Sequence, residues 1–278
     1  MKRLIFSLLL VFFSCTSIQL SEQSLFYPIK EYTLNKNFRL DRQFIVTEDS
    51  VRIETWCLYH EKPEVNIIFF QGNGYNIRFK IPLLNELGKT VQSNIFTFNY
   101  RGFGLSEGNP SIDGIVEDGK AAVKYFTSRI DTIHQLPTYL IGYSIGSFVG
   151  LKNMNIKQIN GIVLISPFTS AEEMIHYLKH KNLPFYKRPF VKLEISNNIY
   201  KLDNLSLIKN VNKPILFIHG TDDNFVPPSM SEELYKISEA KKKKLLLISG
   251  ANHQTIVTEK KFIEQVTAGI KEFIHQTK

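Results

Sequence analysis

Short apolar runs alternate with helical patterns along most of this chain. The runs have strand length and are nearly continuous, as in strands that are covered on both faces of a sheet: residues 65–70, 94–99, 138–141, 161–165, 214–218 and 245–248. Between them, residues 78–90 and 112–130 repeat apolar side chains at helical spacing, and residues 44–46 and 51–59 predict an opening β-hairpin. This alternation predicts an α/β fold with a doubly wound, mostly parallel sheet, in which ligands bind at the carboxyl ends of the strands.

One stretch interrupts the rhythm. Residues 168–212 contain a helix-like segment at 171–180, followed by the helix breakers Pro184 and Pro189. We interpret this stretch as a small cap insertion over the site, with a plain surface crossover as the alternative. The expected organisation is an N-terminal signal over residues 1–15, a linker over 16–38 and one domain over 39–278.

The first fifteen residues differ from the rest. Lys2 and Arg3 precede the apolar run Leu4–Phe13, and a helix of about ten residues is too short to span a bilayer of about 30 Å. A basic head and a short apolar body predict an export signal. Cys15 after Ser14 resembles the lipobox of bacterial lipoproteins, although that family usually has Leu where Phe12 stands. The resemblance implies lipidation of Cys15 and a lipid-anchored protein of the cell envelope; a conventional signal cleaved nearby is the alternative.

Composition narrows the class of protein. A 43% hydrophobic and 22% charged chain is typical of a globular protein, and the formal net charge of +8 suits an anionic membrane surface. The lysines are scattered without interleaved aromatic residues, which argues against nucleic-acid binding. His176 and His180 are four residues apart without an evident third ligand, so we expect no metal and no cofactor.

Gly142-Tyr143-Ser144-Ile145-Gly146 matches the G-x-S-x-G nucleophile elbow, in which a serine occupies a tight strand-to-helix turn. A second match surrounds Ser106, at residues 104–108. Context separates the two, because residues 138–141 form a predicted strand before Ser144 and residues 145–154 can continue as a helix, whereas Ser106 is followed by Glu107-Gly108-Asn109-Pro110, which stop a helix. We therefore expect Ser144 to be the nucleophile.

The base and the acid follow Ser144 in proteins with this elbow. His253 lies in a loop directly after the predicted strand 245–248, whereas His275 lies in a polar chain end and His219 precedes the candidate acids. His253 is therefore the expected base, and His219 is expected to be packed or to act through a neighbour. Asp222 and Asp223 follow the strand 214–218, and the residue pattern does not separate them as the acid that orients His253.

From about Ile45 to the C-terminus, the chain resembles α/β-hydrolases of the serine-aminopeptidase-like and lysophospholipase-like branch. The motifs that carry this resemblance are Gln71-Gly72-Asn73-Gly74, the segment Asn99-Tyr100-Arg101-Gly102-Phe103-Gly104-Leu105-Ser106-Glu107-Gly108, the elbow, the acid loop and Gly250-Ala251-Asn252-His253. The family register G-x-x-D-x-x-V-P falls on Gly220, Asp223, Val226 and Pro227, and so selects Asp223 as the acid. The resemblance also implies an oxyanion hole made by the backbone N–H groups of Asn73 and Ile145.

Two positions depart from the family. The family usually has His where Gln71 stands and Asp where Asn99 stands. Neither change removes a backbone donor, but the first puts the positioning of the oxyanion loop in question.

The expected function is hydrolysis of a carboxylic ester or thioester of a small or lipid-like acyl substrate, through Ser144, His253 and Asp223. An amidase or aminopeptidase is the second reading, for which Glu172, Glu173 and Glu194 of the cap are candidate anchors for a substrate amine. A non-catalytic envelope binding protein is the third.

Overall fold

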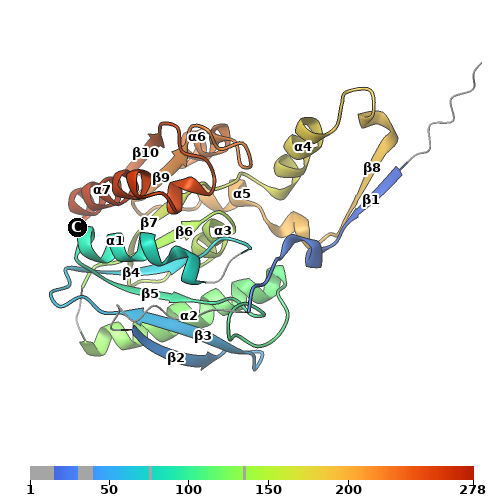
Figure 1. Ribbon diagram of the computed structural model, residues 1–278. Helices are drawn as coiled ribbons and strands as arrows, with labels where there is room; N and C mark the ends of the chain where they lie inside the picture. Colours follow the sequence, from blue (N-terminus) through green and yellow to red (C-terminus); the bar gives the residue numbers. More distant parts are fainter. Residues whose placement is uncertain (1–15, 31–39, 75–76, 134–135) are drawn as a thin grey trace, which may run out of the picture.

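The computed structural model describes residues 16–30, 40–74, 77–133 and 136–278 (Figure 1). The proposed signal and Cys15 lie outside the described residues, as does part of the expected linker. Among the described helices, none combines the length and the hydropathy that crossing a membrane requires.

An eight-stranded sheet forms the centre of the described chain, in the order β10-β9-β7-β6-β4-β5-β3-β2. The pairs β2–β3 and β3–β5 are antiparallel and the other neighbours are parallel. This is the predicted α/β fold with a mostly parallel sheet. The strands are β2 (Leu40–Val46), β3 (Arg52–Leu58), β4 (Val65–Phe70), β5 (Ser93–Phe98), β6 (Thr138–Tyr143), β7 (Ile159–Ile165), β9 (Ile215–Gly220) and β10 (Lys243–Ile248).

Helices cover both faces of this sheet. Helices α1 (Ile81–Val91) and α7 (Lys260–Thr277) share one apolar cluster with Ile67 and Phe69 of β4. Helices α2 (Ile112–Ile133), α3 (Ile145–Lys152) and α6 (Pro228–Ile237) share the other cluster with Ile68 and Phe70. Successive side chains of a strand point to opposite faces, so a strand covered on both faces needs apolar side chains at successive positions, as Ile67–Phe70 provide in β4.

The middle part of the insertion expected at residues 168–212 extends away from the main body of the protein (Figure 1). It contains α4 (Ala171–Asn182), β8 (Val191–Ile195) and α5 (Asn204–Ile208), and an isolated bridge between Ser170 and Asp203 joins its two ends. Short 3-10 helices complete the described elements: η1 (Glu22–Leu25), η2 (Ile77–Lys80), η3 (Arg188–Phe190), η4 (Ile199–Lys201) and η5 (Thr255–Val257).

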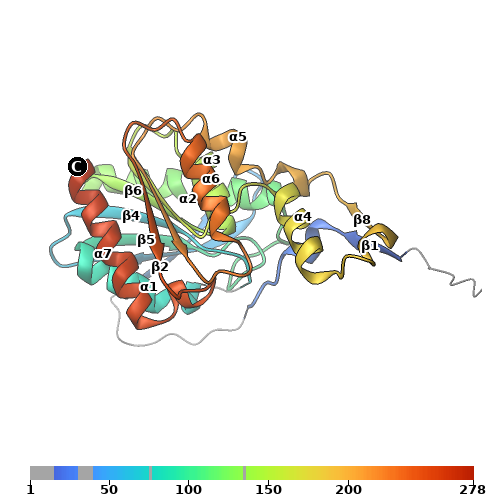
Figure 2. The ribbon, with the colours of Figure 1, turned by 90° about the horizontal axis from the view of Figure 1, so that it is seen from above.

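The segment that we expected to be a linker, residues 16–38, is folded where the structure describes it. β1 (Thr16–Leu20) pairs in parallel with β8, and both strands lie away from the main body in two views (Figures 1 and 2). Buried Glu22 then accepts hydrogen bonds from Ile112 N and from Asn198 Nδ2. These partners are far away in the sequence, which is why local sequence patterns gave no sign of the packing.

Candidate active site

Ser144 lies in a tight turn between β6 and α3. Its φ of 54° and ψ of −122° place a non-glycine residue in a strained backbone region. The flanking glycines have no room for a side chain, since a Cβ on Gly142 would lie 2.5 Å from Gly146 O and a Cβ on Gly146 would lie 2.3 Å from Phe70 O. The turn therefore presents the Ser144 hydroxyl at the carboxyl end of β6, next to the end of β4.

The three side chains singled out in the sequence meet at this edge of the sheet. Ser144 Oγ lies 3.1 Å from His253 Nε2, and His253 Nδ1 lies 2.7 Å from Asp223 Oδ2. His253 comes from the loop after β10 and Asp223 from the loop after β9. A hydroxyl, an imidazole and a carboxylate in this order can transfer the hydroxyl proton to the imidazole and hold the resulting cation.

Asp223, rather than Asp222, faces the imidazole. Its carboxylate accepts hydrogen bonds from Phe225 N at 3.0 Å and Val226 N at 2.9 Å, and it is buried, whereas Asp222 is exposed. Burial acts to raise the pKa of Asp223, but the hydrogen bonds from His219 and His253 outweigh it and hold this pKa well below its usual range. The carboxylate is therefore charged at neutral pH.

His219 also contacts the carboxylate of Asp223. It is fully buried, with Nδ1 2.6 Å from Ser231 Oγ and Nε2 2.9 Å from Val226 O and 3.2 Å from Asp223 Oδ2. This agrees with the packed position that its place in the sequence suggested.

Aromatic rings pack around His253 and leave its ring partly open. Tyr143 and Phe225 have ring centroids 5.3 and 5.1 Å from that of the imidazole, and the Tyr143 hydroxyl donates to His253 O at 2.7 Å. Behind Tyr143, the ammonium of Lys80 lies 4.4 Å from the ring centroid, and burial lowers the pKa of Lys80 to about 8. Sequence reasoning missed Lys80, since an isolated lysine in an amphipathic segment carries no signal of burial.

The two departures from the family pattern contact one another. Gln71 Nε2 donates to Asn99 Oδ1 at 3.3 Å, and the same oxygen accepts a hydrogen bond from Ile77 N at 3.1 Å. Asn99 Nδ2 in turn donates to Glu54 Oε2 at 2.7 Å, and Glu54 is fully buried in β3. The Asn99 amide thus contacts Gln71 at the end of β4 and Ile77 of η2, and it is itself bound by the Glu54 carboxylate.

The residues expected to form the oxyanion hole lie at the start of α3 and in the loop after β4. Ile145 is the first residue of α3, so its backbone N–H has no acceptor within the helix. Asn73 lies in the loop after β4, and its side-chain amide reaches the N-terminal segment, where Nδ2 donates to Leu25 O and Oδ1 accepts from Tyr27 N at 3.4 Å. This third attachment of the loop was not visible in the sequence.

Ser106, the competing serine, is part of the interior. Its hydroxyl accepts from Glu54 N at 2.9 Å and donates to Asn99 O at 2.8 Å, and its side chain is buried. Both of its hydrogen-bonding partners are backbone groups, with no imidazole among them. Its role is therefore structural, as the helix-breaking residues after it suggested.

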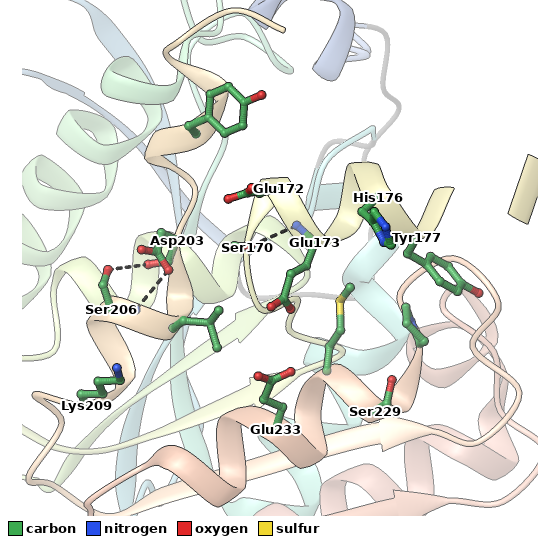
Figure 3. Close-up of a pocket in the computed structure, with 14 residues that line it drawn as sticks. Ser170, Glu172, Glu173, His176, Tyr177, Asp203, Ser206, Lys209, Ser229 and Glu233 are labelled. Atoms are coloured by element: carbon green, nitrogen blue, oxygen red, sulfur yellow. Dashed lines mark hydrogen bonds between the residues drawn. The ribbon is translucent and has the colours of Figure 1, made fainter. Parts of the chain in front are cut away.

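A separate acidic cleft of about 820 Å³ lies between the cap and α6 (Figure 3). Glu172 and Glu173 of α4 and Glu233 of α6 line it, and Ser144, Asp223 and His253 are not among its lining residues. Glu194, the third acid that we considered, is exposed on β8, where it lies 3.5 Å from Lys192.

Comparison with known proteins gives the family. Residues 61–210 and 203–261 match the family described as serine aminopeptidase, S33. The chain belongs to this family. It is 30% identical over 227 residues to the α/β-hydrolase domain-containing protein WAV2 of Arabidopsis thaliana. The aligned part covers 77% of this chain and 71% of WAV2. An uncharacterized membrane protein of Saccharomyces cerevisiae is 25% identical over 221 residues, covering 77% of this chain and 74% of that protein.

Solved structures agree on the fold of this α/β-hydrolase. An esterase of Pyrococcus furiosus superposes with a TM-score of 0.72 at 20% identity, covering 91% of this chain and 97% of the esterase. A soluble variant of the monoglyceride lipase of Saccharomyces cerevisiae, bound to a substrate analogue, superposes with a TM-score of 0.68 at 16% identity and covers 90% of this chain and 99% of its own. The family and these neighbours make the chain a hydrolase.

Proposed function

We propose that this hydrolase is a serine esterase that cleaves carboxylic esters or thioesters through an acyl-enzyme. The observation that carries the proposal is the continuous line of hydrogen bonds from Ser144 Oγ through His253 to Asp223 Oδ2. It begins on a strained turn and ends on a buried, charged carboxylate. A binding protein without catalysis has no need of either feature.

The reaction has two balanced halves. Ser144 Oγ attacks the acyl carbon while its proton moves to His253 Nε2, and the proton then passes to the leaving alcohol or thiol as the acyl–oxygen or acyl–sulfur bond breaks. A water molecule next loses a proton to His253 and attacks the acyl carbon; the bond from that carbon to Ser144 Oγ breaks, His253 returns the proton to Oγ, and the carboxylic acid is released. Throughout, Asp223 orients the imidazole and stabilises its cationic form.

The tetrahedral intermediates carry negative charge on the former carbonyl oxygen. We assign its stabilisation to the backbone N–H groups of Asn73 and Ile145, each of which contributes about 3 kcal/mol when it is well placed. The attachments of the Asn73 loop to Asn99 and to residues 25–27 support this assignment, because a donor contributes fully only if it is held in position before the charge develops.

Ester rather than amide cleavage is favoured by two observations. Two structural relatives are named as an esterase and a monoglyceride lipase. In addition, the cap acids Glu172 and Glu173 belong to a cleft that none of the three proposed catalytic residues lines, so they are poorly placed to anchor a substrate amine.

We also propose that the chain is exported and lipidated at Cys15. This proposal rests on the sequence of residues 1–15 alone. Metabolic labelling with a clickable fatty acid, compared between the natural chain and Cys15→Ser, tests it: label should be incorporated only where Cys15 is present.

Turnover on matched substrates tests the function. We expect the protein to hydrolyse p-nitrophenyl esters over a series of acyl lengths and to be much slower on aminoacyl p-nitroanilides, with both rates lost in Ser144→Ala. Ser106→Ala is the matched control and should keep its activity per folded molecule. Faster cleavage of the anilides would overturn the ester assignment, and full activity of Ser144→Ala would overturn the mechanism.

A further inference from the structure

The outer end of the cap exposes aromatic side chains to solvent. We call residues 183–192 the cap tip. Phe185 is 77% exposed, Tyr186 54% and Phe190 36%. Three large aromatic residues within six positions make a concentrated apolar surface, and such surfaces mark contacts with other molecules or with membranes.

Positive charge surrounds these rings. From residue 174 to residue 193 the chain has no Asp or Glu, and Lys179, Lys181, Lys187, Arg188 and Lys192 all fall within that stretch. Lys187 is exposed at the cap tip itself. Glu172 and Glu173 of the cap lie at the other end of α4, in the cleft of Figure 3, whereas Glu194 Oε1 lies on β8, 3.5 Å from Lys192 Nζ. The cap is therefore polarised, with Lys187 and Arg188 beside the exposed rings at its outer end.

Hydrogen bonds within the cap fix the conformation of the cap tip. Arg188 Nε donates to Leu183 O at 2.9 Å and Arg188 Nη2 to His180 O at 2.6 Å, while Lys179 Nζ donates to Val191 O at 3.0 Å. These bonds tie the turn back onto the end of α4 and onto β8. The rings are thus presented by a fixed frame, which lowers the entropy that is lost when they are buried.

The N-terminal segment meets the fold at the same place. In the parallel pairing of β1 with β8, Thr16 is opposite Val191, directly next to Phe190. Cys15 and the apolar run Leu4–Phe13 immediately precede Thr16 in the sequence. Figures 1 and 2 both show the β1–β8 pair beyond the main body, on the side of α4. Any attachment to a membrane through Cys15 would therefore bring the cap tip to that membrane.

From this juxtaposition we propose that the cap tip docks on the surface of an anionic lipid bilayer. Aromatic rings settle at the depth of the lipid headgroups, and basic side chains are attracted by anionic headgroups. A second copy of the chain fits less well, because a two-fold contact through the cap tip would bring two identical basic clusters together. A single lipid anchor binds weakly and a basic or aromatic patch strengthens it, so the two elements are complementary.

Docking would also orient the proposed active site. From the middle and the C-terminal end of α4, Tyr177 Oη donates to Asn224 O at 3.2 Å and Lys181 Nζ donates to the same oxygen, next to Asp223. The cap thus connects the docked surface to the loop that carries the acid, and substrates in the bilayer would reach the site from the same side. This consequence rests on the proposed function, whereas the docking itself does not.

A fluorescent probe on the cap tip tests the docking directly. An environment-sensitive maleimide dye is attached to Phe185→Cys or, as a matched control, to Lys260→Cys, in the full chain carrying Cys15→Ser. The remaining cysteine, Cys57, is buried and its thiol pKa is raised to about 12 by burial, so it does not react in the folded protein.

With vesicles that contain phosphatidylglycerol, we expect the emission at position 185 to shift to the blue and to be quenched by brominated acyl chains. We expect no such change at position 260, and a weaker change at 185 with phosphatidylcholine alone. Adding Lys187→Glu and Lys192→Glu should raise the lipid concentration for half-maximal shift by about thirtyfold or more, since each base near the surface contributes about 1 kcal/mol and two are removed. Lys260→Glu with Lys261→Glu, read with the probe at position 185, controls for net charge.

Three results would overturn the proposal: no shift at 185, an equal shift at both probe positions, or a shift at 185 that grows with protein concentration in the absence of lipid. The last would assign the surface to a second copy. Turnover of a soluble ester by the same labelled proteins keeps this test separate from that of the proposed function, because the cap tip contributes no atom to the Ser144–His253–Asp223 line.

Discussion

Replacing Asn99 by the residue that its family usually has should damage this protein. Asn99→Asp exchanges the amide nitrogen that faces Glu54 for a carboxylate oxygen. The two oxygens would then be about 2.7 Å apart in a fully buried site. The natural sequence thus keeps one carboxylate in this network, at Glu54, and an amide at position 99.

The magnitude follows from two limits. Two unit charges at the Asn99–Glu54 distance of 2.7 Å repel by about 6 kcal/mol at an effective dielectric constant of about 20. The pair avoids this repulsion by binding one proton, which costs about 4 kcal/mol at pH 7 and about 1.5 kcal/mol at pH 5 for a carboxyl group with an ordinary pKa near 3.9. Binding the proton costs less than the repulsion. We therefore expect Asn99→Asp to lower the free energy of unfolding by at most about 4 kcal/mol at pH 7.

The sign of the pH dependence is fixed by the same reasoning. The introduced carboxyl has a raised pKa in the folded state, so the folded protein holds a proton that the unfolded chain releases. The stability of Asn99→Asp relative to the natural protein is therefore greatest below about pH 4 and falls by about 1.4 kcal/mol per pH unit above it, until the folded-state pKa is passed.

Urea unfolding of both proteins between pH 5 and pH 8 measures this difference. Adding Glu54→Gln to Asn99→Asp restores one carboxylate facing one amide, so it should recover most of the loss, whereas Glu54→Gln alone should not stabilise the protein. A loss that does not change with pH, or an Asn99→Asp protein as stable as the natural one at pH 7, would refute the assignment of Glu54 as a buried carboxylate facing Asn99.

Three further predictions concern single side chains. Asp223→Asn should lower kcat by about four orders of magnitude with the fold intact, because the amide cannot hold the tautomer of His253 that accepts a proton. Steady-state ester kinetics with a circular dichroism control measure this change. A loss in kcat below tenfold would contradict the role of Asp223. Ser106→Ala should lose about 1–3 kcal/mol of stability in urea unfolding, since it removes a buried hydroxyl with two backbone partners, and an unchanged midpoint would contradict that structural role. The Cys57 thiol, whose pKa burial raises to about 12, should resist iodoacetamide at pH 8 until the protein unfolds, and rapid alkylation in the native state would show that it is accessible.

Local patterns predicted the central sheet well. β4 runs over Val65–Phe70, the same six residues as the mostly apolar run, because a strand covered on both faces needs apolar side chains at successive positions. The sequence order of serine, acid and histidine led to Ser144 and His253, and the resemblance to the family register selected Asp223; the fold brings these three side chains together. In both cases the information lies within a few residues of the element concerned.

Contacts between residues far apart in the sequence could not be predicted from local patterns. Asn99 is 45 positions from Glu54 and 28 from Gln71, so the two departures from the family pattern could not be recognised as neighbours. The strand β8 did carry an alternating pattern, Val191-Lys192-Leu193-Glu194-Ile195, but its partner β1 lies in a segment without a strand signal of its own. The residue pattern alone did not separate Asp222 from Asp223; the family register selected Asp223, and the turn after β9 buries it while Asp222 stays exposed.

Mapping a covalent adduct tests the central claim most directly. The protein is treated with a fluorophosphonate, digested, and analysed by peptide mass spectrometry, in parallel with His253→Ala. The account predicts one adduct per chain, on the peptide that contains Ser144, and labelling slowed by at least a hundredfold without the imidazole. An adduct on Ser106, or equally fast labelling without His253, would contradict it.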